Sequence, residues 1–120
     1  MRFSMRIAAL AASVAALVMV ATPALAARSH ATGKAITVTA SEFKFKLSTT
    51  TVSAPGAVTF TVVNKGKIPH DFKIAGKKTP LLKPGKSAKL TVRLKKGKFA
   101  YLCTVAGHAT LGMKGTVTVK

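Results

Sequence analysis

Apolar and polar residues alternate in short runs from residue 35 onward, and this feature most restricts the fold. In the run SEFKFKLS, the two phenylalanines and the leucine share one face, whereas Glu42 and the two lysines share the other. An apolar residue at every second position is typical of a half-buried β-strand. Further apolar or alternating runs lie at 35–40, 57–64, 70–76, 88–95, 98–103 and 115–120. Beyond the N-terminal segment no run has a helical period, so the sequence predicts an all-β domain.

Turn signals separate these runs at regular spacing. The segment 77–87 contains Pro80 and the pair Pro84–Gly85, which predicts a loop. Short strands broken by proline and glycine favour an antiparallel β-sandwich or a barrel. A chain of 120 residues is long enough for one such domain.

The charge of the chain is strongly unbalanced. Twenty Lys and Arg residues face two acidic residues, for a net charge of +18. The lysines occupy polar strand positions, which is typical of solvated sheet faces and not of a disordered basic tail. A cationic surface suits an acidic partner or an anionic cell-wall environment. Nucleic acid is not expected, because one tyrosine and no tryptophan offer few stacking platforms.

The first 26 residues have the pattern of a secretory signal peptide. Arg2 and Arg6 precede an apolar run, and the small-residue site ALA at 24–26 follows it. We expect a signal peptide at 1–26, a flexible leader at 27–34 and the domain at 35–120, with no stable membrane insertion after cleavage. An uncleaved anchor is the alternative. The protein is then extracytoplasmic: periplasmic, cell-surface or secreted.

Cys103 is the only cysteine, so the chain cannot form an internal disulfide. In an oxidising compartment an exposed free thiol would oxidise or would link two copies of the protein. We therefore expect a bound group on this thiol. His108 and Met113 follow it at equal intervals within one loop, and Gly107 and Gly112 allow that loop to curl back. A thiolate, an imidazole and a thioether are soft or borderline ligands that suit copper, and a blue-copper site adds a second imidazole.

His70 is the candidate for the second imidazole. It opens a predicted strand after the turn KGKIP, whereas His30 lies in the leader. In a sandwich, loops from distant strands gather at one end. We therefore predict one copper ion held by His70, Cys103, His108 and Met113, with Met113 as a weak axial ligand. If cleavage instead follows residue 27, His30 becomes the third residue of the mature protein. A histidine at that position forms an amino-terminal motif that can bind copper or nickel.

Three stretches resemble the cupredoxins, the small blue copper proteins that include plastocyanin and azurin. They are SAPGAVTFTVVNKGKIPHDFKI, LKPGKSAKL and YLCTVAGHATLGMKGTVTV. The resemblance covers residues 36–119 and implies an eight-stranded Greek-key sandwich. It also implies the same four ligands. The chain departs from the family in its loop spacing and in Ala106–Gly107, where many relatives have a proline near the histidine.

Asp71 follows the first ligand, where plastocyanin and azurin have asparagine. The resemblance implies that this side chain supports the ligand loop through Thr104. An ionised aspartate offers only acceptors, so it can accept hydrogen bonds from Thr104. A carboxylate near the site is also expected to favour Cu(II) and lower the reduction potential.

The resemblance implies a secreted one-electron carrier and not an enzyme, with copper cycling between Cu(II) and Cu(I). Electrons are expected to pass through His108, surrounded by a docking patch of Ile68, Ala109 and Leu111. The expected partner is a redox protein with an acidic surface, such as an oxidase copper domain or a cytochrome. We expect a monomer. An extracytoplasmic copper chaperone or storage protein is the alternative.

Overall fold

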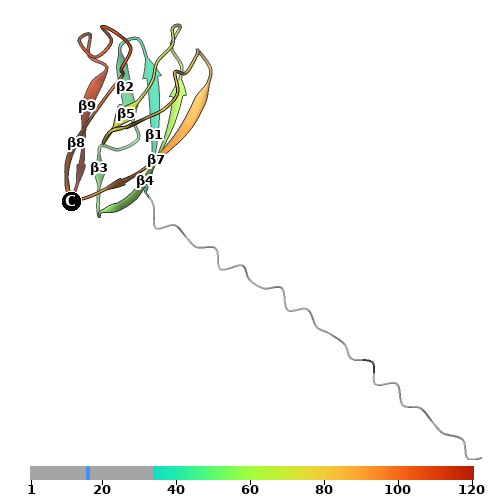
Figure 1. The fold of residues 1–120 in the computed structure, drawn as a ribbon, viewed down its shortest axis with the longest axis vertical. Helices are drawn as coiled ribbons and strands as arrows, with labels where there is room; N and C mark the ends of the chain where they lie inside the picture. The colour runs from blue at the N-terminus through green and yellow to red at the C-terminus, as the bar shows by residue number, and fades with distance from the viewer. Residues whose placement is uncertain (1–15, 17–33) are drawn as a thin grey trace, which may run out of the picture.

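The structure is a computed structural model that describes residue 16 and residues 34–120. Apart from residue 16, the predicted signal peptide lies outside this part of the chain, as do residues 27–33 of the leader, including His30. Between residues 34 and 120 the chain forms nine strands and no helix (Figure 1). The strands are β1 (Lys34–Ser41), β2 (Lys44–Leu47), β3 (Thr51–Val52), β4 (Gly56–Asn64), β5 (Lys73–Ile74), β6 (Lys77–Lys78), β7 (Ser87–Leu94), β8 (Gly97–Leu102) and β9 (Lys114–Val119).

Two sheets form the two layers of a β-sandwich, as the alternation predicts. One sheet has the order β2-β1-β4-β7 and the other the order β3-β9-β8-β5-β6. Each sheet turns its apolar face inward, and the aromatic rings meet at the centre, where Phe72 packs against Phe45, Phe60 and Tyr101. The buried apolar core comprises Ile36, Val38, Val52, Val58, Phe60, Val62, Phe72, Ile74, Leu82, Val92, Leu94, Tyr101, Val117 and Val119.

The sheets are mixed, so the expectation of a purely antiparallel sandwich is wrong at two strand pairs. Strands β1 and β4 are parallel, and so are β3 and β9. The cause is the path of the chain, which leaves the first sheet after β2, contributes β3 to the second sheet and returns to lie beside β1. A crossing of this kind brings a strand back in the same direction, which a hairpin cannot do.

The predicted strands differ from the observed ones mainly where they are short. Strands β3 and β6 have two residues each, too few to produce a visible alternation. The run 70–76 contains only β5, while His70 forms an isolated bridge with Leu82. The predicted loop at 77–87 therefore includes β6 and this bridge.

Three connections meet at one end of the sandwich (Figure 1). They are the β1–β2 turn, the segment between β4 and β5, and the β8–β9 loop. Alternate residues of a strand face inward, and this pattern places two buried side chains at this end. Cys103 is two residues beyond buried Tyr101, and Asn64 is two residues beyond buried Val62. Glu42, two residues beyond buried Ala40, is exposed and stands in the β1–β2 turn.

The outer faces carry the charge. Every lysine and arginine from Lys34 to Lys120 is exposed, which confirms that these side chains solvate the sheet faces. Within residues 34–120, none of them forms an ion pair with a carboxylate. The described part of the chain contains no helix that could span a membrane.

Candidate metal centre

Three of the predicted ligands converge at the loop end of the sandwich. Ligand atoms of His70, Cys103 and His108 all lie within 4.8 Å of one another, and all three side chains are buried. The two Nδ1 atoms are 3.1 Å apart, and His108 Nδ1 is 3.5 Å from the Cys103 sulfur. Two imidazole nitrogens and a sulfur that face a common point in a buried pocket form a donor set suited to a soft or borderline metal ion.

His70 is held in place by its backbone. Its N–H donates to the Leu82 carbonyl at 3.0 Å, and its own carbonyl accepts from the Leu82 N–H at 2.8 Å. The loop before it is fixed from inside by the buried side chain of Asn64, which donates to the carbonyls of Ile68 and Leu82 and accepts from the Gly66 N–H. The imidazole therefore sits on a framework with few free torsions.

Cys103 and His108 share a tightly closed loop. The Cys103 N–H donates to the Met113 carbonyl at 3.0 Å, and the Met113 N–H donates to the His108 carbonyl at 3.1 Å. Gly107 and Gly112 adopt φ angles of 81° and 117°, which side chains rarely allow. The two predicted glycine positions are thus where the backbone reverses.

Met113 is completely buried and packs in one cluster with Cys103 and Ala40. The loop hydrogen bonds bring its backbone next to that of both Cys103 and His108. All four predicted ligands therefore gather at one end of the sandwich.

Asp71 and Thr104 are in contact, as the sequence predicts. The Asp71 carboxylate accepts the Thr104 N–H at 2.6 Å and also accepts the Thr104 hydroxyl. This carboxylate is buried, and it links the residue after His70 to the residue after Cys103. The two ligand-bearing segments are thereby tied together by hydrogen bonds to a charged group.

Burial sets the protonation of the two ligands in the β8–β9 loop. It raises the pKa of the Cys103 thiol, and the nearby Asp71 charge adds to the effect. It lowers the pKa of His108, and the neighbouring His70 contributes in the same direction. His108 is therefore neutral at pH 7, with a lone pair available, whereas a metal ion must displace the thiol proton when it binds.

The β1–β2 turn supplies contacts that the sequence reasoning missed. Glu42 is exposed, as its assignment to a solvent face predicts, and its carboxylate also lies 3.3 Å from His70 Nε2. The next residue, Phe43, packs edge-on against His108 with ring centroids 5.0 Å apart. The sequence signal for Glu42 was its charge, because the chain has only two acidic residues.

Apolar side chains are exposed near this end. Ile68 is 37% exposed and Leu111 is 62% exposed, while Ala109 is half-buried. Leu81, which the sequence did not suggest, is 58% exposed and precedes the bridge partner of His70. His108 itself is 7% exposed, so a buried ligand and exposed apolar side chains occur at the same end of the sandwich.

The fold and the site together define a class: a small all-β sandwich with a buried histidine–cysteine–histidine group at its loop end. The family model of the cupredoxin-like domain matches residues 9–119. The chain therefore belongs to the cupredoxin-like domain family, as its sequence motifs predict. A comparison with curated proteins finds no match.

Solved structures share the fold. A reduced auracyanin from Roseiflexus castenholzii has a TM-score of 0.64 at 21% identity, over 72% of this chain and 97% of that one. Auracyanin A from Chloroflexus aurantiacus, described as a blue copper protein, has a TM-score of 0.58 at 21% identity, over 73% and 99%. A copper-containing nitrite reductase from Thermus scotoductus has a TM-score of 0.59 at 19% identity, over 73% and 28%. The same fold thus occurs in a blue copper protein and within an enzyme.

Proposed function

We propose that this protein is an extracytoplasmic one-electron carrier with a single blue copper site. His70, Cys103 and His108 are the principal ligands in this proposal, and Met113 is the weak axial ligand. The observation that carries the proposal is the buried convergence of two imidazole nitrogens and the only thiol of the chain. Membership of the cupredoxin-like family and the likeness to auracyanin support it.

The donor chemistry supports copper over other metals. Thiolate, imidazole and thioether together are the ligands of blue-copper centres, whereas calcium and magnesium require oxygen ligands. When bound, copper takes up and releases one electron. The residues supply a frame that changes little between the two oxidation states, because hydrogen bonds that involve Leu82, Asn64 and the accepting carboxylate of Asp71 hold both ligand segments. A rigid frame lowers the rearrangement that accompanies electron transfer.

The proposed ligand set favours a carrier over an enzyme. Four protein ligands leave no position open for a substrate, in contrast to catalytic metal sites, which keep one. His108 is 7% exposed, and exposed Ile68 and Leu111 belong to connections at the same end of the sandwich, which supports a route for the electron through this imidazole.

The charge distribution supports an acidic redox partner, such as an oxidase copper domain or a cytochrome. The exposed lysines are free of carboxylate partners within residues 34–120, so they attract a negatively charged surface and raise the association rate at low salt. The secretory pattern of residues 1–26 supports a location outside the cytoplasm.

The test is a visible and electron paramagnetic resonance spectrum of the protein, expressed from the full chain and loaded with Cu(II). We expect an intense blue absorption with narrow copper hyperfine splitting, lost in Cys103→Ser and altered in His70→Ala. The matched control is His30→Ala, which removes a histidine outside the site and leaves the spectrum unchanged. A colourless protein with a weakly absorbing copper signal contradicts the proposal and favours the chaperone or storage alternative.

A further inference from the structure

The chain has only two acidic residues, and both lie at the metal centre. On a surface crowded with lysine, a carboxylate would ordinarily pair with a neighbouring cation. Neither does so: Asp71 accepts from Thr104, and Glu42 accepts from the loop that leads to His70. Glu42 forms the one ion-pair contact within residues 34–120, and its partner is His70.

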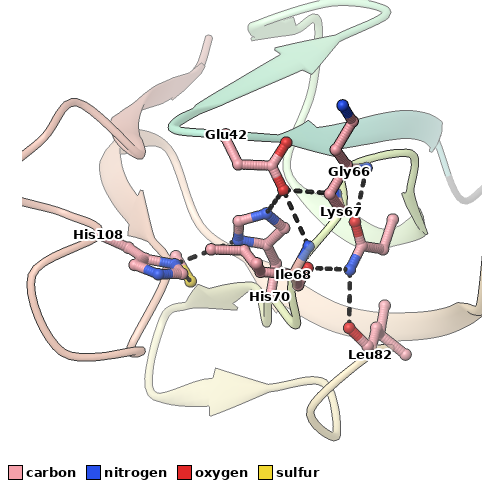
Figure 2. Close-up of polar contacts among 9 residues, drawn as sticks. Glu42, Gly66, Lys67, Ile68, His70, Leu82 and His108 are labelled. Carbon is pink, nitrogen blue, oxygen red and sulfur yellow. Dashed lines mark hydrogen bonds and ion pairs between the residues drawn. The ribbon is translucent and has the colours of Figure 1, made fainter. Parts of the chain in front are cut away.

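One oxygen of Glu42 makes three polar contacts (Figure 2). Its Oε1 accepts the Lys67 N–H at 2.5 Å and the Ile68 N–H at 3.0 Å, and it lies 3.3 Å from His70 Nε2. The side chain of Glu42 is 30% exposed, and like other exposed carboxylates it is ionised at neutral pH.

This contact selects one tautomer of His70. An ionised carboxylate can only accept, so the hydrogen atom must be on Nε2. A neutral imidazole carries one such hydrogen, which leaves the lone pair on Nδ1. That atom is the one that faces the Nδ1 of His108, 3.1 Å away, in the buried ligand group. The carboxylate thus contacts Nε2 on one side of the imidazole ring, and the ligand group lies at Nδ1 on the other side.

We propose that Glu42 is a positioning residue for His70: it fixes the ring orientation and the Nε2–H tautomer, and its charge favours the oxidised metal ion. This inference rests on the proposed function. A carboxylate behind a ligating imidazole makes the imidazole a stronger donor and stabilises the higher charge on the ion. Here the carboxylate comes from the β1–β2 turn and contacts the first histidine at Nε2, on the side of the ring away from the ligand group.

Gly66 preserves the space that the carboxylate needs. A Cβ atom at this position would collide with the carboxylate of Glu42. The Gly66 N–H is held by the Asn64 side chain at 2.8 Å, so the backbone resists moving away. Gly66→Ala is therefore expected to displace the carboxylate while it leaves every polar group in the protein.

The first experiment needs no copper. Long-range proton–nitrogen NMR spectra of the metal-free protein report the tautomer of each imidazole, and His70→Ala assigns the signals. We expect His70 to be the Nε2–H tautomer in the wild type and in Glu42→Gln, whose amide oxygen still accepts. In Glu42→Ala and Gly66→Ala we expect a mixture of tautomers.

The second experiment measures the reduction potential of the copper-loaded protein. Loss of a polar partner of a metal ligand commonly weakens binding about 10-fold or more. We expect Glu42→Gln to weaken the oxidised form about 10-fold relative to the reduced form, which raises the potential by about 59 mV. The matched control is Ser53→Lys, which raises the net charge by the same unit on an exposed residue of the β3–β4 connection. Figure 1 shows this connection at the end of the sandwich away from the β8–β9 loop.

Two results would overturn the inference. One is an Nδ1–H tautomer of His70 in the metal-free wild type. The other is a potential in Glu42→Gln that moves no more than in Ser53→Lys. If the wild type binds no copper, the proposed function fails, while the NMR measurement still decides the relation between Glu42 and His70. If Glu42→Ala does not fold, Glu42→Gln and Gly66→Ala decide the same question.

Discussion

Replacing Asp71 by alanine should destabilise the metal-free protein by about 3 kcal/mol. The carboxylate accepts two hydrogen bonds from Thr104, one from the backbone N–H at 2.6 Å and one from the hydroxyl. A hydrogen bond to a charged group contributes about 1.5–3 kcal/mol. The lower value applies to both, because Thr104 is exposed and water can partly replace the lost acceptor.

Two further variants separate charge from hydrogen bonding. Asp71→Asn keeps an acceptor for the Thr104 N–H, and its amide can donate to the hydroxyl. Neutral hydrogen bonds contribute about 1 kcal/mol each, so asparagine should recover about 2 of the 3 kcal/mol. Thr104→Val removes only the hydroxyl, and a double-mutant cycle with Asp71→Ala should give a coupling energy of about 1.5 kcal/mol.

The assay is urea unfolding of the metal-free, reduced protein followed by circular dichroism. A loss of 3 kcal/mol also lowers the melting temperature by about 12 °C or more, since 1 kcal/mol corresponds to about 4–8 °C in a domain of this size. The reasoning is refuted if Asp71→Ala costs less than about 1 kcal/mol and the coupling energy stays below about 0.5 kcal/mol.

Four other changes have defined outcomes. The pKa of Glu42 is lowered to about 2, so its ionised form adds stability above pH 4.5 that is lost as the pH falls through 2; the unfolding free energies of wild type and Glu42→Gln should differ at pH 6 and converge near pH 2, and a difference that persists at pH 2 contradicts this. Phe72→Ala removes a buried ring that contacts three aromatic side chains, so it should cost about 3–5 kcal/mol in urea unfolding; a cost below about 1 kcal/mol would place the ring outside the core. Met113→Leu conserves volume, so it should cost less than about 1.5 kcal/mol yet change the copper spectrum; an unchanged spectrum removes Met113 from the ligand set. Leu111→Glu should slow electron transfer to an acidic cytochrome more than Ala100→Glu, the same charge change on an exposed residue of β8; equal rates argue against docking near His108.

Local patterns were sufficient for much of the fold. Strand β7 and the run from β8 to Cys103 follow from alternation, because the two-residue period of a strand is set by neighbouring residues alone. The short spacing of Cys103, His108 and Met113 also predicts that they share one loop, because it depends only on residues close together in the sequence. The burial of Asn64 also follows from its phase in β4, although its hydrogen bonds to the ligand loop do not.

Relations between distant segments required the tertiary structure. The sequence nominates His70 by elimination, whereas its Nδ1 meets His108 because two connections from different parts of the chain reach the same end of the sandwich. The parallel pairing of β1 with β4 depends on a crossing between sheets that no local pattern encodes. Glu42 belongs to this second group: its charge is visible in the sequence, but the turn that brings it to His70 exists only in the folded chain. Periodicity specifies which side of a strand is buried, whereas strand pairing and turn geometry specify what that side meets.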